Sequence, residues 1–264
     1  MKKVKVVMSF LMFTLLISNA QAIEEVAVDT ELQLLLDVSG SVNSNEYQLQ
    51  LDGYSNSFAS SNLQQAILSG PIGSIAVQLI MWSGSDDQQV MIDWTLVDSI
   101  ESSNSLASTI ASLARPFAGW TAIGEAVAFG YPQFENNGFS GTQNVVDVSG
   151  DGTNNSGMSP AQARALALAN GVDTINGIVI TNSQAVKDQY EQEVVGGQDA
   201  FMLATNNYQT FEQAIDQKLI GEITGNKPDG AVSVPTPNSL IILMLALWFV
   251  LRPSHNIKTI QEAL

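Results

Sequence analysis

The sequence has no cysteine and only one histidine among its 264 residues. The absence of cysteine excludes disulfides and thiolate chemistry. The single histidine, His255, lies close to the end of the chain, which excludes a Ser-His-Asp triad or a histidine-ligated zinc site within the main domain. Carboxylate and hydroxyl oxygens are left as the candidate ligands and reactive groups.

Basic residues are also scarce. The chain contains 10 Lys and Arg against 26 Asp and Glu, which gives a formal net charge of −16 at pH 7. Nucleic-acid binding is not expected, because a phosphate-binding face requires clustered Lys or Arg. The acidity favours divalent cations, although it can equally serve only to keep the protein soluble. With 45% hydrophobic residues, the chain can bury a sizeable core and is not typical of a disordered protein.

Residues 1–22 are typical of a secretory signal peptide. Lysines at positions 2, 3 and 5 precede an apolar run from Val6 to Ile17, and the small-x-small sequence Ala20-Gln21-Ala22 follows. We therefore expect export from a bacterial cell, with the mature chain starting near Ile23. An uncleaved N-terminal anchor is the alternative, although the apolar run is short for a membrane span.

Three further segments are expected after a single domain at residues 28–224. Residues 225–238 are rich in turn-forming residues and predict a linker. Residues 239–252 are almost purely apolar up to the closing arginine, and residues 253–264 form a tail. Helical residues from 239 to 251 would cover about 20 Å, which is less than the roughly 30 Å of a bilayer core.

The apolar segment and its flanks resemble the C-terminal protein-sorting signal called PEP-CTERM. Pro235-Thr236-Pro237 stands where that signal has Pro-Glu-Pro, and Arg252 follows the apolar run. The chain departs from the signal at Thr236 and by continuing past Arg252 to residue 264. The resemblance implies processing by an exosortase-type membrane enzyme. A short membrane anchor is the alternative, and either one would place the protein at the cell envelope, in the periplasm or outside the cell.

Apolar strands alternate with amphipathic helices between these ends. Short apolar or alternating runs predict strands at residues 31–36, 74–82, 89–95, 144–149, 174–180 and 199–203. Helical spacing and capping residues, with Ser44 as the first N-cap, predict helices at 46–60, 102–113, 122–129, 159–170, 185–194 and 208–223. The pattern predicts a doubly wound α/β fold with a mostly parallel central sheet, helices on both faces and one antiparallel edge strand, at 89–95.

Carboxylates and hydroxyls cluster at the ends of the predicted strands. Asp37, Ser39 and Ser41 form a D-x-S-x-S arrangement after the first strand. These hard oxygen ligands, at alternate positions of a tight loop, suit Mg²⁺, Mn²⁺ or Ca²⁺. For this loop alone, helix capping is the alternative. Thr121 precedes a predicted helix, and Asp151 lies in a glycine-flanked turn after a strand, so both are expected at the same sheet edge. We therefore predict a divalent-metal site made by all five residues.

From about residue 28 to residue 224 the chain resembles von Willebrand factor A domains that carry a metal-ion-dependent adhesion site. The D-x-S-x-S sequence, Thr121 and the Asp151-Gly152 turn carry the resemblance. Local phrases, including Arg115-Pro116-Phe117 and the stretch from Asp147 to Gly157, resemble an exported bacterial subfamily of unknown function. The family fold that this implies is the one that the strand and helix pattern predicts.

The resemblance also implies a role for each predicted ligand. Ser39, Ser41 and Thr121 would coordinate the ion directly, and Asp37 and Asp151 would do so directly or through water. An open coordination position would accept a carboxylate from a protein partner. The expected cofactor is a divalent cation, Mg²⁺ before Mn²⁺ or Ca²⁺, and the expected function is adhesion-type protein binding rather than catalysis. A purely structural metal and, less favoured, a metal-assisted hydrolase are the alternatives.

Other residues near these loops have less specific patterns. Asp147 could hydrogen-bond the loop beneath the metal, or it could be a buried acid satisfied by backbone amides. Asp86-Asp87 is expected to lie in a solvated turn. Trp82, Trp94 and Trp120 could form an exposed patch, although aromatic residues near strands are more often in the core. Trp120 stands where the family often has glycine, and it could line the rim of the site.

Overall fold

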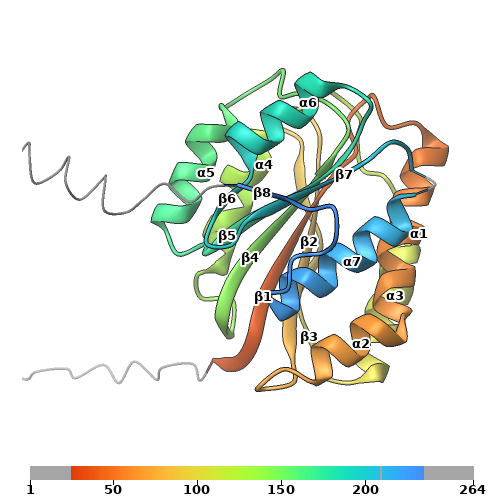
Figure 1. Ribbon diagram of the computed structural model, residues 1–264, viewed down its shortest axis with the longest axis vertical. Coiled ribbons are helices and arrows are strands. Elements are labelled where there is room, and N and C mark those ends of the chain that lie inside the picture. Colours follow the sequence, from red (N-terminus) through yellow and green to blue (C-terminus); the bar gives the residue numbers. More distant parts are fainter. Residues whose placement is uncertain (1–24, 209, 235–264) are drawn as a thin grey trace, which may run out of the picture.

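The computed structural model describes residues 25–208 and 210–234. Their centre is an eight-stranded mixed sheet with helices on both faces (Figure 1). The strands are β1 (Val26–Asp37), β2 (Ile75–Trp82), β3 (Gln88–Val97), β4 (Phe139–Gly150), β5 (Thr174–Ile180), β6 (Gly196–Gly197), β7 (Phe201–Thr205) and β8 (Val232–Ser233). The helices are α1 (Ser44–Ala59), α2 (Ser61–Leu68), α3 (Ile100–Ala111), α4 (Ile123–Gly130), η1 (Tyr131–Phe134), α5 (Pro160–Ala169), α6 (Gln184–Gln189), η2 (Tyr190–Val194) and α7 (Phe211–Thr224).

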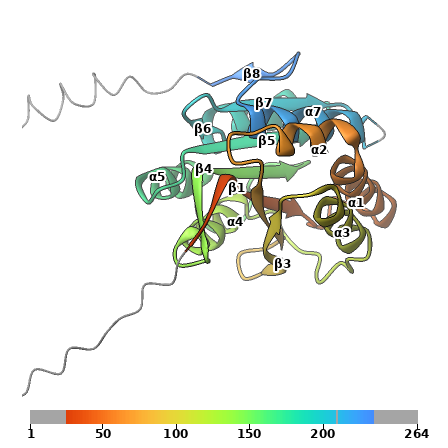
Figure 2. The same ribbon diagram turned by 90° about the horizontal axis from the view of Figure 1, so that it is seen from below.

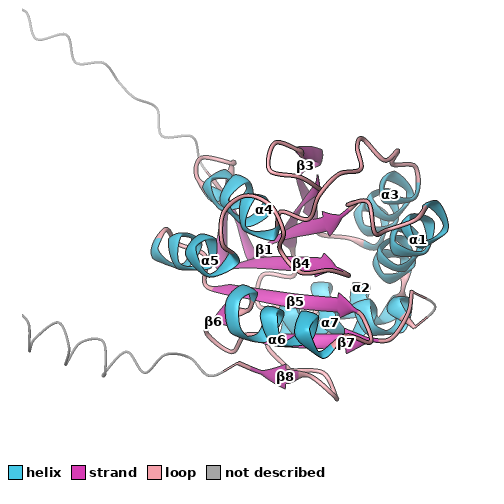
Figure 3. Cartoon of the chain, turned by 90° about the horizontal axis from the view of Figure 1, so that it is seen from above, coloured by secondary structure: helices cyan, strands magenta, loops and turns pink. Residues whose placement is uncertain are grey.

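The predicted doubly wound α/β fold is confirmed. The strand order is β3-β2-β1-β4-β5-β7-β8, with β6 paired to β5. Strands β1, β2, β4, β5 and β7 run parallel, and the arrows of β1, β4, β5 and β7 point the same way in Figure 3. Strand β3 is antiparallel to β2 at one edge, as predicted. At the opposite edge (Figure 2), the two-residue strand β8 pairs antiparallel with β7, and it lies within the range expected to be a linker.

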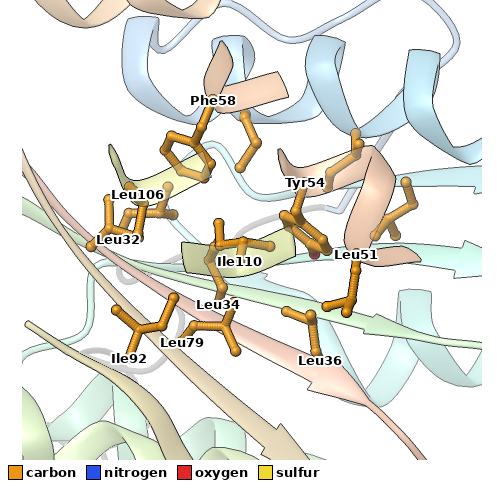
Figure 4. Close-up of a cluster of buried hydrophobic side chains, with 14 of the residues drawn as sticks. Leu32, Leu34, Leu36, Leu51, Tyr54, Phe58, Leu79, Ile92, Leu106 and Ile110 are labelled. Atoms are coloured by element: carbon orange, nitrogen blue, oxygen red, sulfur yellow. The ribbon is translucent and has the colours of Figure 1, made fainter. Parts of the chain in front are cut away.

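The central strand β1 is buried on both faces, as expected for a parallel strand covered by two helix layers. Leu32, Leu34 and Leu36 point toward α1 and α3 and pack with Tyr54 and Phe58 (Figure 4). The intervening Leu35 belongs to a second core on the opposite face, which α4, α5 and η2 cover. In Figure 1, α1, α2, α3 and α7 lie on one side of the sheet and α4, α5 and α6 on the other. Packing on both faces therefore fixes β1 in the sheet, and with it the position of Asp37 at the end of the strand.

Some local predictions need correction. The N-cap of α1 is Asn43 rather than Ser44: the Asn43 side chain accepts the N–H of Glu46, and the Glu46 carboxylate accepts the N–H of Asn43. Such reciprocal bonding satisfies two exposed donors of the helix at once. The helix α2 was not predicted. It starts at a second cap, where Ser60 Oγ accepts the N–H of Leu63, and it buries Leu63 and Ile67, which lie one helical turn apart.

The predicted signal peptide (1–22), the apolar C-terminal segment (239–252) and the tail (253–264) lie outside the described residues, as does Gln209. Within the part of the chain that the structure describes, no helix combines the length and the apolar character needed to cross a bilayer.

Candidate metal centre

The loop after β1 turns tightly around the carboxylate of Asp37, which is fully buried. Asp37 Oδ1 accepts the N–H of Ser39 at 2.7 Å, and this bond closes the turn. The hydroxyls of Ser39 and Ser41 lie 3.1 Å apart. The other carboxylate oxygen, Asp37 Oδ2, is buried without a hydrogen-bond partner among the described residues. An orphaned buried carboxylate oxygen is costly, and a cation beside it would remove that cost.

The second loop follows β4, which pairs in parallel with β1. Ser41 Oγ donates a 2.6 Å hydrogen bond to Asp151 Oδ1 across 110 positions of the sequence. A Cβ at Gly150 would lie only 3.0 Å from Asp37 Oδ2, so the absence of a side chain at Gly150 lets the Asp37 carboxylate approach this strand. The two loops thereby bring the hydroxyl of one and the carboxylate of the other together.

The third loop carries Thr121, two residues before α4. Its main chain is bound to the Asp151 loop by two hydrogen bonds of 2.9 Å: Thr121 N–H donates to Asn155 Oδ1, and Asn155 N–H donates to the Thr121 carbonyl. Thr121 Oγ1 would be 3.7 Å from a Cβ placed at Gly152. The structure therefore brings all five sequence-predicted residues to the carboxyl edge of the sheet, in three adjoining loops.

Arg115 is a residue of this site to which the sequence analysis gave no role. Its guanidinium donates to the carbonyls of Val38, Ser39, Val42 and Phe117 at 2.6–3.1 Å. It therefore fixes both sides of the D-x-S-x-S loop through main-chain atoms. The sequence phrase Arg115-Pro116-Phe117 marked the position, but nothing in the local pattern revealed which segment it binds.

The two carboxylates of the centre have perturbed acidities. Burial, followed by the charge of Asp151, raises the pKa of Asp37 to about 7 against the hydrogen bonds from Ser39. Burial also raises the pKa of Asp151, although the hydrogen bond from Ser41 acts in the opposite direction. Both shifts mean that the ionised forms lack a counter-charge, which a divalent cation would supply.

The donor set fits a hard divalent cation. It combines two carboxylates with three hydroxyls, and oxygen ligands of this kind suit Mg²⁺, Mn²⁺ or Ca²⁺. Across residues 25–208 and 210–234 there is no group of three or more His, Cys, Asp and Glu side chains that could hold a metal. The candidate centre is thus poor in charge and depends on its hydroxyl groups.

Neither alternative for Asp147 is correct. This fully buried side chain points toward α7, where Asp147 Oδ1 forms a 2.6 Å ion pair with Lys218 Nζ. Asp147 Oδ2 accepts a 3.4 Å hydrogen bond from the Tyr54 hydroxyl. Lys218 also pairs with Glu222 at 2.5 Å, and all three side chains have no exposure. Asp147 therefore belongs to a buried ionic cluster beneath α7 and not to the metal loop.

The three tryptophans near the sheet differ in exposure. Trp82 is fully buried, and Trp94 packs against Phe134 with its ring centroid 5.1 Å away. Trp120 is 70% exposed, which supports the idea that it lines the rim of the site. Its backbone is held, because Ser83 Oγ donates to the Trp120 carbonyl at 3.2 Å. Asp86 is exposed, as expected for a solvated turn, whereas Asp87 Oδ2 accepts the N–H of Gly84 at 3.3 Å.

A family model described as "Protein of unknown function (DUF1194)" matches residues 27–227. A search of curated protein sequences finds no match. Among solved structures, the chain is similar to proximal thread matrix protein 1 from the mussel byssus, with 21% identity and a TM-score of 0.58 over 76% of this chain and 49% of that one. A second structure of that mussel protein, with 20% identity and the same TM-score of 0.58, is described as having a zinc-occupied MIDAS motif.

Two further solved structures have the same fold. The pilus adhesin SpaC from Lactobacillus rhamnosus GG has 15% identity and a TM-score of 0.53, over 75% of this chain and 31% of that one. A von Willebrand factor type A protein from Catenulispora acidiphila has 13% identity and a TM-score of 0.51, over 75% of this chain and 43% of that one. This chain spans half or less of the length of each of these proteins. Their structural similarity establishes that it has the von Willebrand factor A fold.

Proposed function

Because this chain belongs to the DUF1194 family and has the von Willebrand factor A fold, we propose that it is a divalent-cation-dependent domain for adhesion-type protein binding. In this proposal Ser39, Ser41 and Thr121 hold the ion directly, while Asp37 and Asp151 hold it directly or through water. Mg²⁺ is the first candidate, since it prefers oxygen ligands and keeps several waters in its coordination shell. An acidic side chain of the partner would replace one of those waters.

The 2.6 Å hydrogen bond between Ser41 and Asp151 carries the proposal. It joins two loops around one point, next to the unpartnered oxygen of Asp37. The three hydroxyl ligands are neutral, so only carboxylates that coordinate directly would offset the charge of a bound divalent ion, and a carboxylate that acts through water would offset less of it. An ion held mainly by neutral hydroxyls stays electrophilic, and it would attract the carboxylate of another protein.

The exposed indole of Trp120 supports binding over a purely structural metal. Large aromatic side chains are enriched at the energetic centres of protein interfaces, and this one adjoins Thr121 on a loop whose backbone is fixed by hydrogen bonds. A structural ion would not require an exposed tryptophan beside it. The zinc-occupied motif described for the mussel protein, and the description of SpaC as a pilus adhesin, are consistent with the same assignment.

We also propose export to the cell envelope, on the basis of the signal-like residues 1–22 and the apolar segment at 239–252. Both segments lie outside the described residues. Sorting, anchoring and cleavage of the C-terminal segment are alternatives that mass spectrometry of the mature protein would distinguish.

Calorimetric titration of Mg²⁺, Mn²⁺ and Ca²⁺ tests the metal centre. The proposal expects saturable binding of about one ion per chain, which Asp37→Ala should abolish. Glu101→Gln is the matched control, because Glu101 is an exposed acid that makes no side-chain hydrogen bond among the described residues. Binding that survives in Asp37→Ala, or no binding in the wild type, would remove the proposed mechanism.

The variant Thr121→Ala separates adhesion from a structural ion. If the ion serves partner binding, this variant should lose carboxylate binding while its melting temperature in the absence of metal stays close to that of the wild type. If the ion is structural, the main effect should be the loss of metal-dependent stabilisation, with no carboxylate binding in either protein.

A further inference from the structure

A crevice of about 370 Å³ opens beside Asp151 at the carboxyl edge of the sheet. The first turn of α1, the end of β5 and the end of β7 form its walls. Five asparagines from these three segments line it: Asn43, Asn45, Asn182, Asn206 and Asn207. Clefts at the carboxyl ends of the strands are where doubly wound folds bind ligands, and this one adjoins the candidate metal centre through Asp151.

The amide groups of these asparagines are only partly used within the protein. Asn43 Oδ1 accepts the N–H groups of Asn45 and Glu46, and Asn182 Nδ2 donates to the Asn206 carbonyl at 3.3 Å. In the described part of the chain, the side-chain amides of Asn45 and Asn206 bond to no other residue. Each amide offers two N–H donors and one acceptor, so the crevice presents donors and acceptors side by side.

The lining also limits the class of ligand. It contains no Lys or Arg, and its two acids are Glu46 and Asp151, so it does not suit phosphate or another anion. Glu46 already accepts the N–H of Asn43 at 2.9 Å. Its only aromatic residue, Tyr208, is 5% exposed, which leaves no ring face for a sugar to stack on. Uncharged donors next to acceptors fit the peptide group, which itself has one N–H and one C=O.

We propose that this crevice binds the main chain beside the acidic residue whose carboxylate completes the metal centre. The site would then recognise a short extended peptide around that residue and not an isolated carboxylate. This inference rests on the proposed function, because the metal fixes the position of the carboxylate. Asp151 borders both the metal loops and the crevice, so peptide groups that flank a bound acid start at the mouth of the crevice.

The test is an NMR titration of the ¹⁵N-labelled full chain with saturating Mg²⁺. The probes are acetate, methyl glucuronide, the blocked peptide acetyl-Gly-Asp-Gly-amide, and the same peptide with N-methylated peptide groups. The proposal expects the peptide to bind at least about tenfold more tightly than acetate, which corresponds to ~1.4 kcal/mol. It also expects the side-chain amide signals of Asn182 and Asn206 to shift with the peptide and not with acetate.

Two variants test whether the asparagines of the crevice cause the tighter binding of the peptide. The double variant Asn182→Ala with Asn206→Ala should lose the advantage of the peptide while it keeps its affinity for Mg²⁺ and acetate. Asn226→Ala is the matched control, because Asn226 is an exposed asparagine that does not line the crevice, and it should behave as the wild type.

The outcomes separate the two proposals. If acetate does not bind in the presence of Mg²⁺, the proposed function fails. If acetate binds but the peptide binds no more tightly, or the N-methylated peptide binds equally well, the peptide crevice is overturned while the metal centre stands. Tighter binding of methyl glucuronide than of the peptide would replace the peptide by an acidic sugar as the ligand.

Discussion

Arg115 binds three carbonyls of the loop that carries Ser39 and Ser41, although it lies 77 positions from Val38. A guanidinium has five N–H donors in a planar fork, whereas a lysine ammonium is a compact charge with three donors. A lysine at position 115 would therefore keep the positive charge but could not bond to all of these carbonyls at once. The loop geometry, and with it the spacing of the two serine hydroxyls, depends on the shape of this side chain.

We predict that Arg115→Lys weakens Mg²⁺ binding by about tenfold or more, and lowers the free energy of unfolding by about 1–3 kcal/mol, because buried carbonyls lose their donors. Calorimetric titration and urea denaturation measure the two effects. The control is Arg164→Lys, since Arg164 is also half-buried and donates to the Val195 carbonyl at 2.7 Å. That variant should cost stability without changing metal affinity. Equal metal affinity in both variants would contradict the role of Arg115.

The position of the five candidate ligands at one edge of the sheet could be predicted, because each lies in a short pattern at the end of a predicted strand or before a predicted helix. The supporting residues could not. Asn155 fixes Thr121 through main-chain and side-chain bonds across 34 positions, and Asp147 finds its partner Lys218 only after α7 folds against the sheet. Such contacts follow from tertiary packing, which local patterns of residues do not encode.

At the scale of helices and strands, periodicity located the apolar core of each main strand better than the ends of the strand. The strand predicted at 174–180 matches β5 in full, and the strands predicted at 74–82 and 89–95 match β2 and β3 within two residues. Strands β1 and β4 extend further toward their N-terminal ends than predicted, because Val26 to Thr30 pairs with Phe139 to Gln143. Pairing between strands lengthens an element beyond its apolar core, and it also creates the two-residue strands β6 and β8.

Helix α7 is attached to the sheet by ions as well as by apolar packing. Lys218 bridges Asp147 and Glu222, and all three are buried. Burial raises the pKa of Glu222 to about 8, although the charge of Lys218 acts in the opposite direction. Burial raises the pKa of Asp147 as well, and the two carboxylates share a single ammonium. The cluster is therefore close to neutral only when one of its acids keeps a proton. The ionic attachment of α7 to the sheet thus depends on pH.

We predict that stability falls as the pH rises from about 4.5 to about 8. The pKa of Glu222 lies near 4.5 in the unfolded chain and is raised to about 8 in the folded one. In that window the folded state keeps a proton on Glu222 that the unfolded state loses. The contribution of this proton to stability is therefore complete below about pH 4.5 and is lost as the pH rises to about 8. Glu222→Gln should make the slope shallower by up to ~1.4 kcal/mol per pH unit. Urea denaturation at a series of pH values, with saturating Mg²⁺, measures this.

Glu212→Gln serves as the control, because Glu212 is an exposed acid on the same helix. It should leave the pH slope as in the wild type. A Glu222→Gln variant with an unchanged slope would mean that Glu222 is ionised in the folded protein, so that the charge of Lys218 outweighs the effect of burial.

At the scale of the whole molecule, sheet order and charge act together. The order β2-β1-β4 puts the loops after β1 and β4 side by side. The loop Gly119–Thr121 is bonded to both, because Gly40 N–H donates to the Gly119 carbonyl and Thr121 N–H donates to Asn155 Oδ1. The sheet order thus brings the candidate ligands to one edge, and Arg115 and Asn155 hold their loops there. The net charge of −16 surrounds this edge with a negative potential, which attracts cations. In the proposed function, this potential would oppose an acidic partner until an ion is bound. Binding of the ion should therefore precede binding of the partner.

Two consequences of this order can be measured on the protein alone. Mg²⁺ at one hundred times its dissociation constant should stabilise the fold by about 2.7 kcal/mol if it binds only the folded state. Because the attraction includes many exposed acids, raising KCl from 0.02 to 0.5 M should weaken Mg²⁺ binding several-fold as their charges are screened. Thermal unfolding and calorimetry at the two salt concentrations give both values.

The variant Asp37→Ala is the control, and Mg²⁺ should not stabilise it at either salt concentration. An affinity independent of salt would mean that the three loops alone hold the ion, and that the acidity of the remaining surface serves only solubility.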